Sequence, residues 1–378
     1  MDNFDLIWAL ITGEYPPLRG GVSDYTRLLA NGLAATGDEV HVWTPDGEGP
    51  APEENNVQVH RLPGRFDRRS IAMLGSALRG LPASCRLFVQ YVPHAYGWKA
   101  MNIPFCLWLT CWRRQPVWVL YHEVAYPLSW SQPIRLNILG AVTRGMASLV
   151  ARAAERVFIS IPAWEPLLPK GRPPAWLPIP STIPTTADRA LRERIRAGLV
   201  GDSGSLLIGH FGTFGPHLTP LLREILPPVL ARDRNRVALL LGGGGKRFAE
   251  ELIGTHPDLK GRLISPGHLP PDELAAHLAA CDLLVQPYAD GASGRRTSLM
   301  AGLGLGLPIV TTKGYLTEPM WEASGAVALA PALSADAFLE QTEALLADPT
   351  RRAGLGQTAA RVYQDRFALE NTIRELQS

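Results

Sequence analysis

Apolar positions along the chain alternate between short continuous runs and longer stretches with helical spacing. The first run, Leu6 to Ile11, is apolar throughout, which is typical of a strand in a parallel sheet that is covered on both faces. After a loop rich in glycine and proline, residues such as Tyr25 and Leu29 recur on one helix face, and Val40 to Trp43 predicts the next strand. This order predicts a βαβ unit, whose right-handed crossover begins a parallel sheet.

The same alternation continues in two halves. It predicts further strands at 57–62, 87–91, 117–121 and 157–160, and then at 206–211, 237–241, 263–265, 283–286 and 308–312. It predicts helices near 67–80, 98–112, 133–154 and 217–232. Between the halves, the proline-rich passage from Pro162 to Pro184 predicts a break in regular structure and a domain boundary. The chain is therefore expected to be an α/β protein with two doubly wound domains, 1–184 and 185–359.

Composition narrows the class of protein. The 378 residues are 46% hydrophobic and 19% charged, which excludes a disordered or coiled-coil chain. A net charge of +2 does not indicate a nucleic-acid partner, which would favour a concentrated basic face. The four cysteines form no Cys-x-x-Cys pair and the nine histidines are scattered, so we expect buried reduced thiols and no metal site.

The expected location is the cytoplasm. The chain starts without a basic segment and small-residue cleavage site of the kind found in signal peptides. The most apolar stretch, Ile103 to Tyr121, is interrupted by Arg113, Arg114 and Gln115, so it is not expected to span a membrane.

Several stretches resemble one known family. They are ITGEYPPLRGGVSDYT (11–26), WVLYHEVAYP (118–127), residues 239–251, SPGHLPPDELAAHLAACDLLVQP (265–287) and GLPIV (306–310). In order and position they resemble the retaining glycosyltransferases of family 4, which have the GT-B fold.

The resemblance implies two Rossmann-like domains that face each other across a cleft. It implies a nucleotide-sugar donor held mainly by the C-terminal domain, and an acceptor (a saccharide, a lipid-linked sugar or a small molecule) held mainly by the N-terminal one. It further implies hexosyl transfer with retention, no metal, no cofactor besides the nucleotide-sugar as co-substrate, and a last helix, 360–378, that returns to the first domain.

Two places in the first half are candidate site residues. Gly20 and Gly21 lie in a strand-to-helix loop, where glycine lets the backbone approach a ligand and the helix N-terminus can bind an anion. His122 ends a strand at the edge where open α/β sheets bind ligands, and a neutral imidazole there can bond a sugar hydroxyl. The alternatives are a plain turn and a structural histidine.

The stretch from Asp290 to Gly306 departs from the family pattern. The family has two glutamates eight positions apart, and an ungapped match places them on Ser293 and Ala301. Ser293 can contact a donor sugar only through its hydroxyl. Asp290 and Glu318 are the candidate catalytic carboxylates that replace the missing pair, together with His122. For Glu318 the alternative is a helix N-terminal glutamate that the dipole stabilises.

Arg295 and Arg296 are additions to the family pattern. The family holds the donor phosphates with an arginine and a lysine in a loop that here contains Gly212 and Thr213. We therefore expect the phosphate-binding charge at Arg295 and Arg296, next to a helix for which Thr297 and Ser298 are the expected N-cap residues. The alternative is a pair of solvated surface arginines.

A second glycine-rich loop follows the strand at 237–241. Gly243 and Gly244 can contact the nucleotide or can simply turn the chain. The loop is not a Walker A motif, because Lys246 is followed by Arg247 rather than by serine or threonine.

An aromatic and basic group suggests peripheral membrane contact. Trp98, Trp108, Trp112 and Trp118 lie near Arg113 and Arg114, and such a patch can touch the inner face of a membrane that carries a lipid-linked acceptor. The alternative is that these tryptophans belong to the core.

Three other functions remain open. One is a GT-B-fold nucleotide-sugar epimerase, and another is a non-catalytic subunit that binds a sugar nucleotide. A dinucleotide-dependent oxidoreductase is disfavoured, because no Gly-x-Gly-x-x-Gly follows the first strand.

Overall fold

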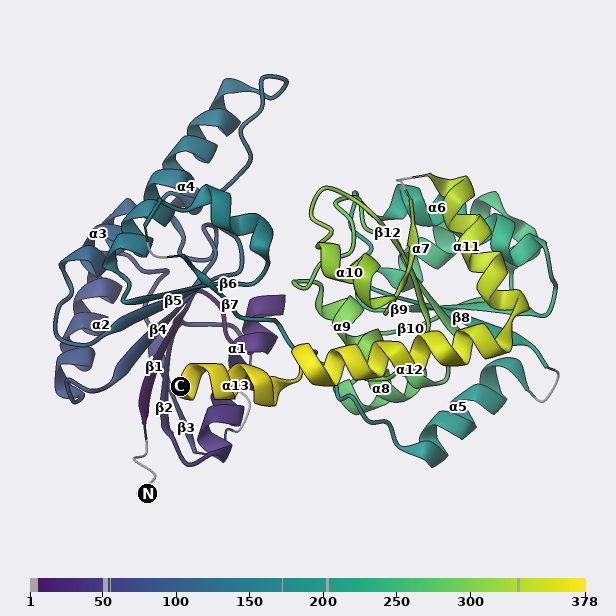
Figure 1. Cartoon of the computed structure of the whole chain (residues 1–378), viewed down its shortest axis with the longest axis horizontal. Helices are drawn as coiled ribbons and strands as arrows, with labels where there is room; N and C mark the ends of the chain where they lie inside the picture. The colour runs from purple at the N-terminus through teal and green to yellow at the C-terminus, as the bar shows by residue number, and fades with distance from the viewer. Residues whose placement is uncertain (1–5, 50–53, 55, 172, 202–203, 332–333) are drawn as a thin grey trace. The chain divides into compact units, whose positions relative to one another are not determined.

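The computed structural model describes residues 6–49, 54, 56–171, 173–201, 204–331 and 334–378. The chain divides into two compact units, which we describe separately. Unit 1 contains Met1–Ile179 and Leu369–Ser378, and unit 2 contains Pro180–Ala368. In each unit helices pack on a parallel sheet (Figure 1). The predicted α/β class with two Rossmann-like parts is therefore confirmed.

Unit 1 contains a seven-stranded parallel sheet in the order β3-β2-β1-β4-β5-β6-β7. Its strands are β1 (Ile7–Thr12), β2 (Glu39–Pro45), β3 (Val57–Leu62), β4 (Arg86–Tyr91), β5 (Val117–Tyr121), β6 (Arg156–Ile159) and β7 (Ala175–Trp176). Its helices are α1 (Gly21–Ala35), α2 (Arg68–Gly80), η1 (Trp98–Ala100), α3 (Ile103–Cys111), α4 (Ile134–Ala153), η2 (Pro162–Leu167) and α13 (Leu369–Gln377).

The two faces of β1 explain its unbroken apolar run. Trp8 and Leu10 pack into one core cluster, with α1 and α13, whereas Ala9 and Ile11 pack into a second cluster, with α2, α3 and α4. All four side chains are fully buried. Because helices cover both faces, alternate positions of the strand are equally apolar.

Unit 2 contains a six-stranded parallel sheet in the order β10-β9-β8-β11-β12-β13. Its strands are β8 (Leu206–Phe211), β9 (Arg236–Leu241), β10 (Leu263–Gly267), β11 (Leu283–Gln286), β12 (Ile309–Thr312) and β13 (Ala328–Ala330). Its helices are α5 (Arg189–Val200), α6 (Thr219–Ala231), α7 (Gly245–Thr255), η3 (Pro257–Leu259), α8 (Pro271–Ala279), α9 (Thr297–Gly304), α10 (Pro319–Ser324), α11 (Ala335–Ala347) and α12 (Pro349–Arg366).

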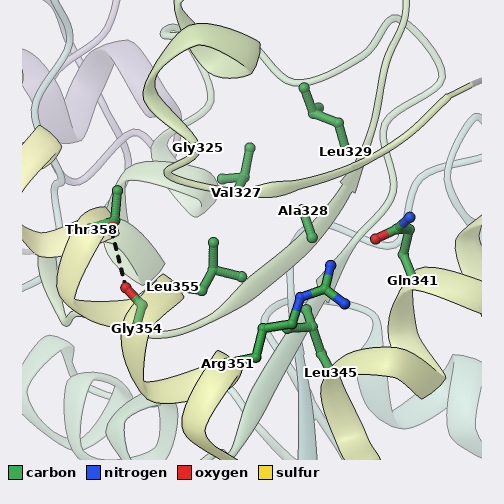
Figure 2. A pocket seen from close by; sticks show the side chains of 10 residues that line it. All are labelled: Gly325, Val327, Ala328, Leu329, Gln341, Leu345, Arg351, Gly354, Leu355 and Thr358. Atoms are coloured by element: carbon green, nitrogen blue, oxygen red, sulfur yellow. Dashed lines mark hydrogen bonds between the residues drawn. The ribbon is translucent and has the colours of Figure 1, made fainter. Parts of the chain in front are cut away.

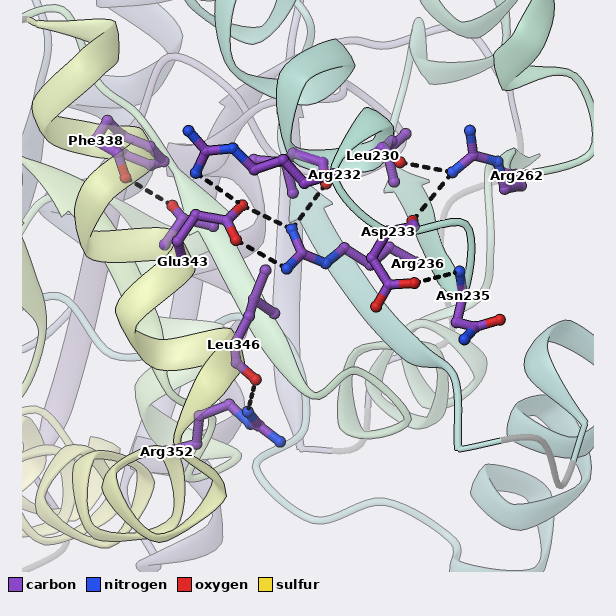
Figure 3. A network of polar contacts seen from close by, with 12 residues as sticks. Leu230, Arg232, Asp233, Asn235, Arg236, Arg262, Phe338, Glu343, Leu346 and Arg352 are labelled. Carbon is purple, nitrogen blue, oxygen red and sulfur yellow. Dashed lines mark hydrogen bonds and ion pairs between the residues drawn. The ribbon is translucent and has the colours of Figure 1, made fainter.

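An ion-paired group ties the amino end of β9 to α11 (Figure 3). Both terminal nitrogens of the Arg236 guanidinium, Nη1 and Nη2, donate to the Glu343 carboxylate, at 2.6 and 2.8 Å, and Arg232 adds a third contact at 3.5 Å. Arg236 is buried, so its charge needs this partner. The group lies at the amino edge of the sheet and fixes the helix that follows β13.

The prediction of no regular structure between Pro162 and Pro184 is wrong. The passage contains the 3-10 helix η2 and the two-residue strand β7, which pairs with β6 at the edge of the sheet. Proline lacks an N–H group, but Pro162 is in the first turn of η2, where N–H groups are unpaired in any case, and β7 itself contains no proline. Strand β13 was also missed, because it has only three residues.

The chain end contains two helices where one was expected over 360–378. Helix α12 belongs to unit 2 and α13 to unit 1. The chain turns at Phe367, which is fully buried and stacks on Trp321 at 5.5 Å between ring centroids. The stacked Phe367 side chain holds the end of α12 within unit 2, and α13 begins at Leu369.

Candidate functional site

The carboxyl edge of the unit 2 sheet carries most of the candidate donor-binding residues. Strand order reverses at β8, whose neighbours are β9 and β11. The loops after β8, β9, β11 and β12 all leave this edge, where open α/β sheets bind ligands. These loops and the first turn of the helix that follows β11 carry all the unit 2 candidates: Gly212, Thr213, Gly243, Gly244, Asp290, Ser293, Arg295, Arg296, Thr297, Ser298 and Glu318. The fold therefore gathers at one sheet edge residues that span over one hundred positions.

Asp290, Arg295 and Arg296 form one ion-paired cluster. One carboxylate oxygen of Asp290 accepts from Arg295 Nη2 at 2.7 Å, and the other accepts from Arg296 Nη2. The side chains are only 14%, 20% and 29% exposed, respectively, and the Arg296 guanidinium lies over the Tyr288 ring. The arginines are thus held in place rather than solvated, and two positive charges face one negative charge.

The N-terminus of α9 lies beside this cluster. Its N-cap is Arg296, and Thr297 is the first helical residue, so the expected N-cap role of Thr297 and Ser298 is wrong. The Ser298 hydroxyl instead bonds Tyr288 Oη at 2.9 Å. Burial raises the pKa of Tyr288 to about 12, so its hydroxyl stays protonated. The first turn of α9 leaves backbone N–H groups that can bind an anion.

Glu318 joins the loops after β11 and β12. One of its oxygens accepts from Gly294 N at 2.9 Å and the other from Trp321 Nε1 at 2.6 Å. Burial raises its pKa, and the two hydrogen bonds oppose that shift. Glu318 is also the N-cap residue of α10. Its carboxylate therefore positions the backbone next to Ser293, whose buried Oγ has no hydrogen-bond partner among the described residues.

The two glycine-bearing loops on β8 and β9 lie in contact. Gly242 has φ +110°, and a Cβ there would overlap the carbonyl oxygen of Gly212. Gly244 is the left-handed N-cap of α7, and a side chain at Gly243 would meet nothing within 4 Å. Gly212 and Gly243 are thus close enough to contact one ligand, and Gly243 leaves room for it.

In unit 1, His122 lies among aromatic and amide groups. It follows β5, its ring meets the edge of Tyr25 from α1 at 5.0 Å, and its Nε2 lies 2.8 Å from Gln90 Oε1. Burial lowers the pKa of His122 to about 3, so the imidazole is neutral. Because the Gln90 oxygen can only accept, Nε2 carries the proton and Nδ1 keeps a lone pair. This assignment follows the amide orientation in the structure.

The loop before α1 holds a carboxylate that sequence reasoning missed. Glu14 Oε1 accepts from Ser23 N, in the first turn of α1, at 3.3 Å. A Cβ at Gly20 would overlap the Glu14 carboxylate, whereas one at Gly21 would meet nothing within 4 Å. Part of the helix N-terminus that was expected to bind an anion is therefore occupied by the chain's own carboxylate.

The four tryptophans do not form one exposed patch, and three of them belong to the core, as the alternative interpretation holds. Trp112 and Trp118 are buried, Trp108 is half-buried against Trp112, and only Trp98 is exposed. They separate because α3 and β5 turn these side chains into the two cores of unit 1. All four cysteines are free, but Cys111, at the end of α3, is exposed rather than buried.

A cavity of about 550 Å³ lies away from these residues (Figure 2). It is formed at the sheet edge by β13, α11 and α12, and its lining includes Leu329, Leu345, Arg351 and Leu355. None of the candidate site residues lines it.

The groups that sequence reasoning missed, Glu14, Gln90 and Tyr288, are ordinary polar residues whose importance depends on their neighbours in space.

Comparison with solved structures defines the class of protein. The chain is similar to sucrose-phosphate synthase from Thermosynechococcus elongatus, with 19% identity, coverage of 98% of this chain and 97% of that chain, and a TM-score of 0.73. It is similar to HepE from Anabaena in complex with UDP (16%, 98% and 98%, 0.67) and to WaaG, a glycosyltransferase involved in lipopolysaccharide biosynthesis (18%, 98% and 98%, 0.64). The fold is the GT-B fold of glycosyltransferases.

Family models identify the chain further. Residues 20–175 match the glycosyl transferase 4-like domain, and residues 206–348 match the glycosyl transferases group 1 domain. The chain therefore belongs to the group 1 glycosyltransferases, which confirms the expected transfer of a sugar from a nucleotide-sugar donor. A search of curated protein sequences finds no match.

Proposed function

We propose that this enzyme transfers a hexosyl unit with retention, and that Arg295, Arg296 and the first turn of α9 bind the donor diphosphate. The observation that carries the proposal is the cluster itself, with two guanidinium groups held on one carboxylate beside a helix N-terminus. As the sugar leaves, negative charge builds on the diphosphate. Preorganised positive groups stabilise that charge without a bound metal or another cofactor.

The proposed role of Asp290 is to orient this pair rather than to attack the sugar. Its two oxygens are each engaged by an arginine. Glu318 is proposed to act in the same indirect way, because both of its oxygens bind groups of the chain. Ser293, with its unpaired hydroxyl, is the proposed donor-sugar contact on this unit.

The proposed role of His122 is to accept a hydrogen bond from a sugar hydroxyl at Nδ1. A neutral imidazole suits this task, because its acceptor lone pair is present across the physiological pH range. Gln90 supports the role by holding the tautomer through Nε2.

The donor nucleotide and the acceptor class also belong to the proposal. HepE binds UDP, and WaaG is involved in lipopolysaccharide biosynthesis. By analogy we propose a UDP-sugar donor and a saccharide or lipid-linked acceptor. We further propose that the enzyme works in the cytoplasm, in peripheral contact with the inner membrane face. No helix in the described residues is long and apolar enough to cross a membrane.

Thermal shift against UDP-, GDP-, ADP- and dTDP-sugars tests the donor assignment, because a ligand that binds only the native state raises the melting temperature. Arg295→Ala and Arg296→Ala should each weaken donor affinity about tenfold or more, the loss typical of a charge-assisted hydrogen bond. Arg194→Ala, which removes an exposed arginine of α5, is the matched control. Unchanged affinity in both cluster variants would contradict the phosphate assignment, and NMR of the product's anomeric centre tests retention.

A second candidate function is a non-catalytic sugar-nucleotide-binding subunit. The observation that favours it is the absence of the family's carboxylate pair, since Ser293 and Ala301 are neutral and both are fully buried. Turnover of radiolabelled donor in the presence of cell-derived acceptors separates the two functions. Donor binding without turnover would select the subunit.

A further inference from the structure

Exposed large apolar side chains are concentrated in one part of unit 1. Among the described residues, all of them except Met73 and Tyr315 lie between Trp98 and Ile138. The most exposed group lies on the loop before α4 and on its first two turns, and consists of Leu128, Trp130, Ile134, Leu136 and Ile138. We call this group the α4 tip. Trp130 is fully exposed, Ile134 is 79% exposed and Ile138 is 57% exposed, which is unusual for side chains of this size.

Hydrogen bonds hold the loop of the α4 tip against the helix. The Asn137 side chain donates to Ser129 O and accepts from Ser129 N and from Gln132 Nε2, at 2.7 to 3.0 Å. Gly140 lets the loop lie against the helix, because a Cβ there would come within 3 Å of Leu128 Cδ2 and Pro127 O. The Asn137 side chain thus holds the loop against the helix, while the large apolar side chains of the tip face solvent. Figure 1 shows the first turns of α4 projecting from the rest of unit 1.

The part of the chain that contains the tip is rich in basic residues. Residues 98–154 contain six lysine or arginine residues and one acidic residue, Glu123, whereas the net charge of the whole chain is only +2. Arg135 lies on the tip itself and is exposed. Lys99 is exposed on the loop after β4, which leaves the same carboxyl edge of the sheet as the loop before α4, whereas Arg113 and Arg114 lie at the opposite, amino edge. A projecting apolar end that carries an exposed arginine complements the surface of an anionic bilayer.

We propose that the α4 tip docks this protein on an anionic phospholipid bilayer, with Trp130, Ile134 and Ile138 inserted at the level of the headgroups and acyl boundary. The inference deepens the membrane contact in the proposed function by naming the surface and the lipid charge. Tryptophan has an apolar body and a polar N–H group, which suits this depth. The tip projects outward, as insertion requires, and Arg135 contacts lipid phosphates.

Vesicle flotation of the full chain tests the proposal. The wild type should float with vesicles of phosphatidylcholine and phosphatidylglycerol, should bind at least tenfold less to phosphatidylcholine alone, and should be released by salt. The triple variant Trp130→Ser, Ile134→Ser, Ile138→Ser should lose at least tenfold in binding to the anionic vesicles. Arg135→Glu should lose the preference for them. Met73→Ser, an exposed apolar side chain on α2, is the control and should bind like the wild type.

Three outcomes would overturn the proposal: no vesicle binding by the wild type, full binding by the triple variant, or self-association that only the triple variant abolishes. The last outcome would make the tip an interface between two copies. Circular dichroism and donor thermal shift should be unchanged in the triple variant, because its substitutions are on the surface. Donor binding and vesicle binding are separate readouts, so failure of sugar transfer leaves the membrane result standing, and the reverse also holds.

Discussion

At the scale of single residues, burial decides the charge of the candidate groups. His122 and His210 are both buried, and burial lowers their pKa values to about 3 and about 4. His210 Nδ1 bonds Val285 O at 2.8 Å, so this ring serves the sheet. His122, by contrast, meets Gln90 and Tyr25 at the edge where the loops leave unit 1. The same residue type is structural in one unit and a candidate ligand contact in the other.

The pKa of His122 makes stability dependent on pH. The ordinary histidine pKa is about 6.5, and the folded value is about 3, so the unfolded chain takes up a proton that the native state does not. The stability that neutral His122 contributes is fully present above about pH 6.5 and is lost as the pH falls toward 3. At pH 5 the loss is about 2 kcal/mol. The free energy of unfolding, measured with urea, should fall between pH 8 and pH 5 in the wild type. In His122→Gln this fall should be smaller by about 2 kcal/mol.

His94→Gln provides the control for this measurement, because His94 is exposed. An equal pH dependence in His122→Gln and the wild type would show that His122 does not titrate on unfolding.

Gly20 supports a second prediction at this scale. Gly20→Ala should displace the Glu14 carboxylate from the first turn of α1, since the new Cβ would overlap it. Loss of a carboxylate at a helix N-terminus costs about 1 kcal/mol. Urea unfolding should show this loss, and Glu14→Ala should add little in the Gly20→Ala background. Additive losses in the double variant would disprove the coupling.

At the scale of elements, α13 is fastened to unit 1 by two arginines at the amino edge of the sheet. Arg86 donates to Leu376 O at 2.8 Å and its guanidinium lies over Trp8 and Trp118. Arg156 pairs with Glu375 at 2.9 Å and also lies over Trp118. The position of α13 thus depends on side chains from β4 and β6, which are distant from it in the sequence.

Arg86→Ala should loosen α13. Removing the guanidinium deletes a hydrogen bond and two cation–π contacts, which together stabilise the native state by about 2 kcal/mol. Hydrogen exchange of amides 369–377 should accelerate, while exchange in β8 and β9 stays as in the wild type. Arg79→Ala, an exposed position on α2, is the control. Unchanged exchange in α13 would show that other contacts hold the helix.

At the scale of the whole molecule, each of the two parallel sheets places the loops that carry the candidate site residues at its carboxyl edge. In unit 1 strand order reverses between β1 and β4, and in unit 2 it reverses at β8. Loops diverge at these points and leave room for ligands. The candidate residues of this group 1 glycosyltransferase thus lie where α/β folds generally bind ligands, at the carboxyl ends of the strands.

Chelation provides a test at this scale. In the proposed function, the Arg295 and Arg296 guanidinium groups supply the positive charge at the diphosphate, so transfer should continue at an unchanged rate after dialysis against EDTA. Activity that EDTA abolishes and Mg²⁺ or Mn²⁺ restores would show that the arginines are insufficient.

Much of the fold follows from local pattern. The apolar run of β5, for example, is bounded in the structure as predicted, because a strand covered on both faces is apolar at nearly every position. Strand β8 also has the predicted bounds, although it contains the buried His210. Short edge elements were missed for the opposite reason. Strands β7 and β13, with two and three residues, are defined by pairing with a neighbour rather than by their own composition.

The candidate site, like the fold, was predicted from the sequence only in part. The residues on the loops after β8, β9, β11 and β12 could be chosen from the sequence, because those loops follow strands and leave one edge. Their partners could not be chosen, because Asp290 reaches Arg295 and Arg296 only through the turn of its loop, and Glu318 reaches Gly294 only across two loops.

By itself the sequence determined the class of fold, the order of its elements and the residue types at the strand ends, since these depend on periodicity and on glycine and proline positions close along the chain. Only the tertiary structure decided which charges are paired, which histidines are neutral and which tryptophans face solvent. Those properties depend on neighbours that are distant in sequence, and burial and hydrogen bonding act through space.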